Sequence, residues 1–425
     1  MEKSVRKRPE SQGVDGRMLQ RLLPAAAMFG ELRELVVHAG LRALELMLEA
    51  ERTEVCGPRY EHDAGRRATR IGHAPGELVL GGRRVTVQRP RARTRDKEEV
   101  LLPSWERFSA EDPLTERAVE QMLVGVSTRK YARSLEPVAA GVATRGTSRS
   151  AVSRRFVAAT QDQLDEWMAT DLRGLRLVAV MIDGLCFRDH VVLCALGIEA
   201  SGKKHVLGIQ EGATENAVAC TELLANLRDR GLRTDRALLF VLDGGKALAK
   251  AVRDVFGAFA LIQRCQVHKM RNVLDQLPEN KRAGIRKTMY DAYRSRSADT
   301  ARRLLNNLER TLRKGHPGAA ASLREGLDET LTVLGFGLGR TLERSLSTTN
   351  AIENLNGNIR RISRRVKTWR DGEMILRWVG AAVNEASKGF RRFRGFEDLK
   401  KLVALLDAHT SKLTKGVDAP VRAVA

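Results

Sequence analysis

Two similar apolar runs in the chain each end in an aspartate that is followed by a glycine. Residues 177–184 read LVAVMIDG and residues 237–244 read ALLFVLDG. A continuous run rich in Val, Ile and Leu predicts a strand buried on both faces, so its terminal Asp would stand at a sheet edge. A single Asp-Gly is usually only a turn. Two of them, with a later Glu in a basic helix, indicate a carboxylate site made by Asp183, Asp243 and a glutamate.

Carboxylates in this number suit a hard divalent metal ion. Asp183, Asp243 and Glu353 would offer the oxygen ligands that Mg²⁺ or Mn²⁺ takes. Two such ions about 3.5–4 Å apart activate an attacking hydroxyl and stabilise the leaving oxygen in phosphoryl transfer. We therefore expect two ions. Spacing alone leaves the third carboxylate open, because three other glutamates lie nearby, namely Glu325, Glu329 and Glu343.

Cys265 and His268 form a Cys-x-x-His pair. It resembles half of a zinc site, but no second Cys/His pair at ligand spacing accompanies it. Packing or hydrogen bonding behind the carboxylates is the expectation. The sequence also lacks a nucleophile motif of the Ser/His/Asp or Cys/His hydrolases.

The charge balance indicates a polyanionic partner. Of the 425 residues, 74 are Lys or Arg and 52 are Asp or Glu, which gives a net charge of +22. Neutralising phosphates releases condensed counterions, so nucleic acid is the first expectation. A basic ribosome-associated or membrane-surface protein has the same charge balance and stays open at this point.

The cysteines and the apolar segments predict a cytoplasmic location. There are five cysteines, an odd number without a pairing rhythm, which is typical of reduced thiols. The basic first residues are not followed by a cleavable apolar region, and no run reaches the length of a membrane span. We expect no membrane association.

The N-terminal part divides by pattern into a disordered basic arm (1–16) and a helical region with a β-hairpin (17–112). Apolar residues recur at helical spacing from Met18 to Cys56. Two short alternating runs flank Gly81-Gly82, which predicts a hairpin over residues 77–80 and 84–91.

Residues 113–172 show a helix-turn-helix rhythm. Short helices are predicted over 114–123, 128–136 and 149–160, two of them with Ser/Thr caps. The third would be a recognition helix whose basic side chains contact DNA, although ordinary helical packing remains the alternative. Those side chains are Arg149, Arg154 and Arg155.

Residues 173–268 predict the first part of an α/β core. The order βββ-α-β-α-β is that of a ribonuclease H-like sheet, in which the first and fourth strands are neighbours, so Asp183 and Asp243 would meet. The polar helical segment 269–345 would be an insertion. Residues 346–400 would hold the helix of Glu353 and a basic helical region, and residues 401–425 a C-terminal helix and tail.

The most basic stretch follows Glu353. Residues 357–394 hold eleven Lys or Arg and three acids, together with four aromatic residues. Basic residues interleaved with aromatics suit a nucleic-acid strand, although a solvated helix face has the same pattern. The candidate DNA contacts are Arg360, Arg361, Arg364, Arg365 and Lys367.

An ordered set of motifs runs through nearly the whole chain. The motifs include the two Asp-Gly pairs, the run Gln263–Lys269 (QRCQVHK), residues 348–356 (TTNAIENLN) and the Cys56-Gly57-Pro58 segment. This set closely resembles the Mutator-type transposases of bacterial insertion sequences.

The resemblance implies a DDE transposase with a ribonuclease H-like core interrupted by a helical insertion. It implies metal-dependent cutting at terminal inverted repeats and joining of the 3′-OH to target DNA. It also implies Glu353 as the third carboxylate, through Asn350-x-x-Glu353-x-x-Asn356. A homo-oligomer, as a dimer on paired DNA ends, follows from the need to hold two ends together.

The positions of the tryptophans depart from the family pattern. Related proteins often carry a Trp within the insertion, whereas the four here lie outside it, at Trp105, Trp167, Trp369 and Trp378.

Two alternative functions stay open. A transposase-derived DNA-binding regulator without catalysis is one alternative. A ribonuclease H-like metal nuclease without strand transfer is the other.

Overall fold

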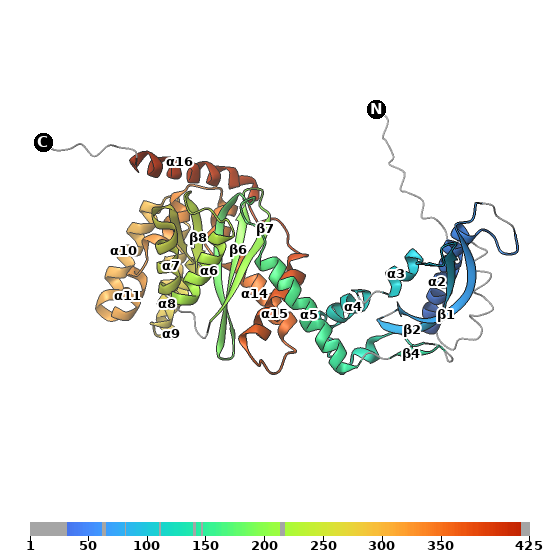
Figure 1. Cartoon of the computed structure of the whole chain (residues 1–425). Coiled ribbons are helices and arrows are strands. Elements are labelled where there is room, and N and C mark those ends of the chain that lie inside the picture. Colours follow the sequence, from blue (N-terminus) through green and yellow to red (C-terminus); the bar gives the residue numbers. More distant parts are fainter. Residues whose placement is uncertain are drawn as a thin grey trace, which may run out of the picture. The chain divides into compact units, whose positions relative to one another are not determined.

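The computed structural model describes residues 32–61, 65–80, 82–109, 112–138, 142–145, 148–212 and 217–417. The predicted basic arm, Gly81 and the C-terminal tail after residue 417 lie outside these residues. The chain divides into two compact units, Met1–Ala159 and Thr160–Ala425 (Figure 1).

The first unit is built on a long helix and a hairpin. Leu44 and Leu48 of the helix pack with Leu78 of the hairpin and with Leu102, because the apolar helix face covers one side of the strands. The predicted hairpin is confirmed, with strands longer than expected. The predicted helical region is confirmed for residues 32–56, and its earlier part, residues 18–31, lies outside the described residues. The elements are α2 (Leu32–Cys56), β1 (Ala68–Leu80) and β2 (Arg83–Thr94), with short strands β3 (Glu99–Val100) and β4 (Thr144–Arg145) on β2.

The helices that follow differ from the predicted triplet. The predicted middle helix over 128–136 is wrong, because only a short 3-10 turn, Tyr131–Ser134, forms there. Tyr131 is buried and its hydroxyl donates to the carbonyl of Gly82 at 3.1 Å, and Pro137 disfavours a helix just before it. The helices here are α3 (Pro103–Ser109), α4 (Asp112–Leu123) and α5 (Arg149–Met168).

The second unit holds a five-stranded mixed sheet within its described residues, in the order β7-β6-β5-β8-β9. The first three strands form an antiparallel meander, and β8 and β9 continue the sheet in parallel with β5. The expected adjacency of the first and fourth strands is therefore confirmed. The strands are β5 (Leu177–Phe187), β6 (His190–Glu199), β7 (Lys204–Gly212), β8 (Leu238–Leu242) and β9 (Ala260–Arg264).

One predicted strand end is wrong. The apolar run of β5 was expected to stop at Asp183, yet the strand continues to Phe187. It continues because β6 goes on pairing with it up to Phe187, whereas the parallel pairing with β8 ends at Ile182 and Leu242. Asp183 therefore lies one residue beyond the last parallel pair.

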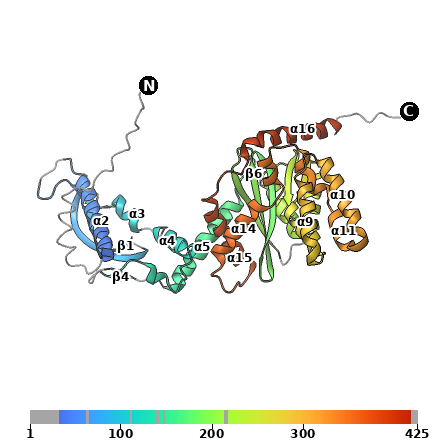
Figure 2. The same ribbon diagram turned by 180° about the vertical axis from the view of Figure 1, so that it is seen from behind.

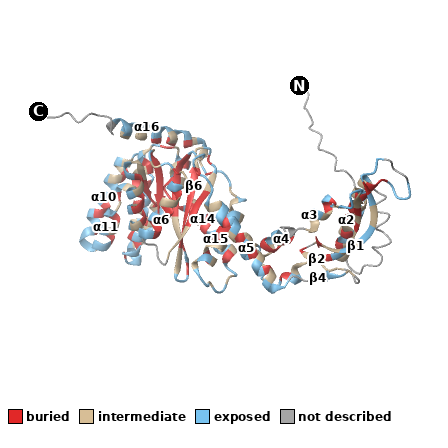
Figure 3. Ribbon diagram, in the orientation of Figure 1, coloured by how far each residue is buried: buried red, intermediate tan, exposed pale blue. Residues whose placement is uncertain are grey.

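Helices cover both faces of this sheet (Figures 2 and 3). Side chains of β8 alternate: Leu238 and Phe240 pack with α6 and α7, whereas Leu239 and Val241 join the core on the other face. The helices of the first face are α6 (Ala217–Asp229) and α7 (Lys246–Phe256), followed by a 3-10 turn, Gly257–Phe259. Those of the second face are α14 (Asn350–Ser363) and α15 (Gly372–Ser387). The last helix, α16 (Leu399–Val417), follows the 3-10 turn Phe396–Asp398 and adds side chains to the same core.

Residues 266–346 are helical, as expected, and contain no strand. They have an apolar core of their own, which includes Leu277, Tyr293 and Leu305. The elements are α8 (Gln266–Asp275), α9 (Glu279–Tyr293), α10 (Ala298–Gly315), α11 (Pro317–Arg324), a 3-10 turn (Asp328–Leu331), α12 (Thr332–Gly335) and α13 (Arg340–Leu346). Across the described parts of the chain, no helix combines the length and the apolar character that a membrane crossing requires.

Candidate active site

The three candidate carboxylates come from three elements, β5, the end of β8 and α14, that lie near the point where the parallel pairing of β5 with β8 ends. Asp183 and Asp243 directly follow Ile182 and Leu242, which are paired in parallel. Neighbouring strands lie about 4.8 Å apart, so the backbone positions of Asp183 and Asp243 lie close together. Glu353 lies in the first turn of α14, whose Ile352 and Leu355 are buried in the core that also holds Met181 and Leu185 of β5.

The raised pKa of Asp183 shows that the negative charges of these carboxylates repel one another. Burial, and next the negative charge of Asp243, raise the pKa of the Asp183 carboxyl above its usual range, and Glu353 adds to the effect. A bound cation reverses such repulsion and favours the charged carboxylates. The donor set and its unbalanced charge therefore fit a hard divalent ion.

Asn356 holds one of the carboxylates in place. Its Nδ2 donates to Oδ2 of Asp183 at 2.8 Å, and the side chain is only 2% exposed. Because Asn356 lies almost one turn after Glu353 on α14, the helix that presents Glu353 also fixes Asp183. Asn350, by contrast, is exposed at the first residue of α14.

Thr349 is a site residue that sequence reasoning missed. Its buried hydroxyl donates to Oε1 of Glu353 at 2.6 Å and lies 3.3 Å from Sγ of Cys265 and 3.4 Å from Nδ1 of His268. The available signal was its position four residues before Glu353, the spacing at which helical side chains meet.

Cys265 and His268 lie beside Glu353, and Nε2 of His268 is 3.9 Å from Oε1 of Glu353. Burial alone would raise the pKa of the Cys265 thiol, but hydrogen bonds with His268 and Thr349 lower it, and the bond to Cys265 raises the pKa of His268. Ligand atoms of Cys265, His268 and Glu353 lie within 4.8 Å of one another, a grouping that no other described trio shares. It is one ligand short of a closed tetrahedral zinc set. We interpret the pair as support for Glu353.

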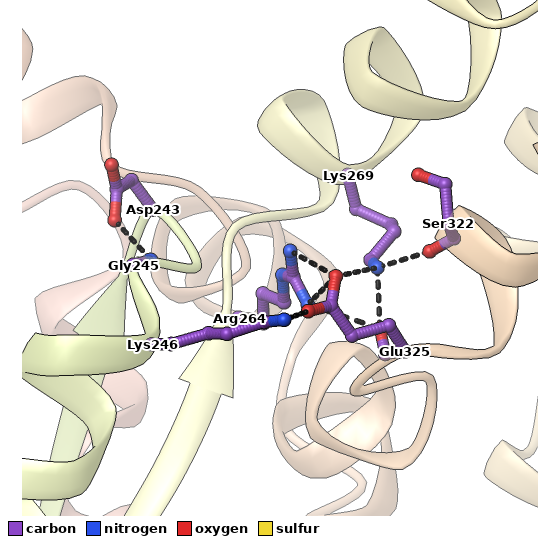
Figure 4. A network of polar contacts seen from close by, with 7 residues as sticks. All are labelled: Asp243, Gly245, Lys246, Arg264, Lys269, Ser322 and Glu325. Carbon is purple, nitrogen blue, oxygen red and sulfur yellow. Dashed lines mark hydrogen bonds and ion pairs between the residues drawn. The ribbon is translucent and has the colours of Figure 1, made fainter. Parts of the chain in front are cut away.

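Asp243 lies on a tight turn, and its carboxylate faces Gly245 (Figure 4). Its Oδ1 accepts a hydrogen bond from the backbone N–H of Gly245 at 2.9 Å. Gly244 has φ +115°, and a Cβ there would lie 2.3 Å from Nε of Arg264. The glycine is thus required both by its backbone conformation and by the arginine packed against it.

The same arginine joins a polar network that ties the helical segment to the sheet (Figure 4). Glu325 pairs with Arg264 at 3.4 Å and with Lys246 at 3.2 Å. Lys269 is fully buried, and its Nζ donates to the carbonyls of Ser322, at 2.5 Å, and Glu325. Burial lowers the pKa of Lys269 to about 8.

The other glutamates that spacing left open have different partners. Glu325 belongs to the network of Arg264, Glu329 pairs with Arg253, and Glu343 lies 3.8 Å from Arg340. Among the described carboxylates, Glu353 and Asp243 are those whose charges act on Asp183. The geometry therefore favours Glu353 as the third member.

The candidate DNA contacts fall in both units. Arg149 and Arg154 are exposed and Arg155 is half-buried on α5, in the part that belongs to the first unit. The others are exposed at the end of α14 and in the segment after it, at Arg360, Arg361, Arg364, Arg365 and Lys367. Arg360 and Arg361 of the second group lie on the same helix as Glu353, and the other three follow the end of that helix.

Comparison with known proteins defines the class. Residues 26–392 match the model of the family described as "Transposase, Mutator family", so the chain belongs to that family of transposases.

Relatives from several bacteria match across most of their length. The chain is 28% identical over 366 residues to the transposase for insertion sequence element ISRM5 of Rhizobium meliloti (strain 1021), covering 84% of this chain and 90% of that protein. It is 28% identical to the transposase for IS406 of Burkholderia multivorans (strain ATCC 17616 / 249), covering 85% and 94%. The transposase for IS256 in transposon Tn4001 of Staphylococcus aureus is 25% identical, with 79% and 86% covered.

The hydrogen bond from Thr349 to Glu353 should strengthen metal binding. Thr349→Val keeps the shape but removes the donor to Glu353, so half-maximal DNA cutting should need about 10–100-fold more metal ion, the usual cost of losing support for a ligand. Thr349→Ser keeps the hydroxyl, so its variant should need the same metal concentration as the wild type. A titration of Mg²⁺ in a cutting assay measures this.

Thr348 offers the matched control, since its buried hydroxyl makes no hydrogen bond within the described structure. Thr348→Val should leave the metal requirement unchanged. An equal shift in both valine variants would show that Thr349 acts on packing alone.

Proposed function

We propose that the chain is a DDE transposase that cuts DNA at terminal inverted repeats and joins the freed 3′-OH to target DNA. The observation that carries the proposal is that the charges of Asp243 and Glu353 act on Asp183 where the parallel pairing of β5 with β8 ends, and that Asn356 and Thr349 hold two of these carboxylates. Family membership supports action on insertion-sequence ends.

We further propose that the five-stranded sheet is a ribonuclease H-like core and that residues 269–345 interrupt it. Support comes from the strand order β7-β6-β5-β8-β9, with three antiparallel strands followed by two parallel ones. The separate apolar core of the helices between β9 and α14 supports an inserted segment.

The three carboxylates would hold two ions, Mg²⁺ or Mn²⁺, at the place where these side chains meet. When bound, the ions supply the activated hydroxyl and stabilise the leaving oxygen. The protein supplies position: Asn356 orients Asp183, the Gly245 amide orients Asp243, and Thr349 orients Glu353. No covalent protein intermediate is needed, because the attacking group is water or a DNA 3′-OH.

The DNA would be held by basic side chains on both units. The exposed basic residues at the end of α14 and just after it lie close along the chain to Glu353, so they would bind phosphates near the reacting bond. Arg149, Arg154 and Arg155 would bind DNA from the first unit. A homo-oligomer, as a dimer on two paired ends, would complete the assembly.

The test is a reaction on labelled duplex DNA that ends in the repeat flanking this element, with Mg²⁺ or Mn²⁺. We expect nicking at the repeat and transfer of the 3′ end to a second duplex, and neither with a scrambled repeat. Binding of the repeat without any cutting would favour the non-catalytic regulator. Cutting without joining would favour the metal nuclease.

A further inference from the structure

A cavity of about 720 Å³ opens beside the outer strand of the sheet in the second unit. Its walls come from the end of α5, the start of β7, the end of α15 and the segment after α15. Side chains that matter here are those of Lys204, Arg230, Phe390, Arg391 and Arg392. None of the three candidate catalytic carboxylates lines it.

The lining is cationic. Five Lys or Arg line the cavity, the fifth being Lys203, against two acids, Glu166 and Asp171. Asp171 is already paired with Arg173 at 2.8 Å. Within the described structure, no carboxylate forms an ion pair with any of four of these cations, Lys203, Lys204, Arg391 and Arg392. An anion is therefore the ligand that this charge favours.

Lys204 is the half-buried member of these cations without a carboxylate partner. Its Nζ lies 4.7 Å from the centre of the Phe390 ring, and the residue is half-buried. Burial lowers the pKa of Lys204, since no carboxylate offsets the loss of water. Burying a charge without a partner costs free energy, which a ligand anion would recover.

Arg230 makes the base of the cavity rigid. Its guanidinium donates to three main-chain carbonyls, those of Thr170 at 3.0 Å, Leu207 at 2.8 Å and Trp167 at 3.2 Å. These acceptors are neutral, so they fix the group without cancelling its charge. Arg230 thus ties the end of α5 to β7 and keeps a positive charge at the cavity.

The cavity lies within reach of a DNA molecule bound at the carboxylates. Asp183 pairs with Cys194 on β6, which pairs with Ile209 on β7, and His205 lies four residues before Ile209. Two strand spacings and four residues along a strand give about 16 Å. One DNA strand advances about 3.4 Å per nucleotide along the helix axis, so this span equals roughly five base pairs.

We propose that this cavity binds backbone phosphates of the DNA duplex whose reacting bond lies at the carboxylates, about five base pairs away. The inference rests on the proposed function. Cations without counter-ions, next to an aromatic ring, are the chemistry with which proteins follow a nucleic-acid backbone. The cavity is thus a second DNA contact, separate from the arginines that follow Glu353 on α14.

The test uses the full chain and a fluorescent duplex carrying the flanking repeat. Arg391→Gln/Arg392→Gln removes two exposed charges, and Lys204→Gln removes the half-buried one. A matched control, Lys400→Gln/Lys401→Gln, removes two exposed charges from α16. The dissociation constant is measured by anisotropy across a salt series.

We expect each lost phosphate contact to lower the slope of log affinity against log salt by about 0.9, which weakens binding roughly tenfold at about 0.1 M salt. The loss should be the same on unrelated duplex sequences, because phosphates carry no base identity. The α16 control should keep the wild-type slope.

The outcomes separate this inference from the proposed function. If the wild type cuts and joins the repeat while both cavity variants keep its salt slope, the cavity does not bind DNA and the function stands. If the variants change the oligomeric state in sedimentation but not the slope, the cavity is an interface between copies and the inference is overturned. If the wild type neither binds nor cuts the repeat, the proposed function itself fails.

Discussion

Asp183→Asn, Asp243→Asn and Glu353→Gln should each reduce DNA cutting by about 1,000-fold or more while the protein still folds and binds DNA. Each change keeps the shape of the side chain and removes one negative ligand oxygen. Metal ions supply several kcal/mol of transition-state stabilisation, and each 1.36 kcal/mol corresponds to about tenfold in rate. Single-turnover cutting with saturating enzyme measures the loss independently of DNA affinity.

Glu343→Gln is the matched control for this set. Glu343 is also a half-buried glutamate, but it lies on α13 and pairs with Arg340 rather than with the carboxylate group. Its variant should cut at nearly the wild-type rate. A wild-type rate in any of the three carboxylate variants, or an equal loss at Glu343, would remove the basis for the assignment.

Gly244→Ala should lower both stability and cutting. The new Cβ would lie 2.3 Å from Nε of Arg264, in a residue whose φ is +115°. Backbone strain costs about 1–3 kcal/mol, and overpacking costs a similar amount, so the free energy of unfolding should fall by about 2–6 kcal/mol. Cutting should fall as well, because the turn that presents Asp243 would move. Chemical denaturation and the cutting assay give the two values.

Gly257→Ala separates the clash from the strain. Gly257 also has a positive φ, +54°, but no atom lies within 4 Å of the position that its Cβ would take. Its variant should lose about 1–3 kcal/mol and keep full cutting activity. If the two alanine variants behaved alike, the contact with Arg264 would have no role at the site.

The sequence predicted those parts of the fold that local pattern determines. Continuous apolar runs identified β5 and β8 because both faces of these strands are buried, and the order of elements then predicted their pairing. The middle helix before α5 was wrong because Tyr131 is anchored to the hairpin at Gly82, a contact between residues far apart in sequence. The end of β5 was wrong because pairing with β6 outlasts pairing with β8.

Local pattern also predicted only some of the residues of the candidate site. Asp183 and Asp243 were found from their strands, whereas the choice of Glu353 depended on resemblance. The support of Glu353 by Thr349, and the network of Arg264, Lys269 and Glu325, depend on tertiary contacts. Arg264 and Glu325 lie 61 positions apart, beyond the reach of any local pattern.

The most direct test of the metal site is a change in metal preference at Asp243. Asp243→Cys replaces a hard oxygen by a soft sulfur, which binds Mg²⁺ poorly and accepts softer ions better. The measurement is the rate of repeat cutting in Mg²⁺ and in Mn²⁺ for the wild type, Asp243→Asn and Asp243→Cys. We predict that the wild type cuts in both metals, that the Asn variant cuts in neither, and that the Cys variant regains cutting in Mn²⁺ alone. Cutting by the Asn variant at the wild-type rate, or equal cutting by the Cys variant in both metals, would contradict a metal-binding role for Asp243.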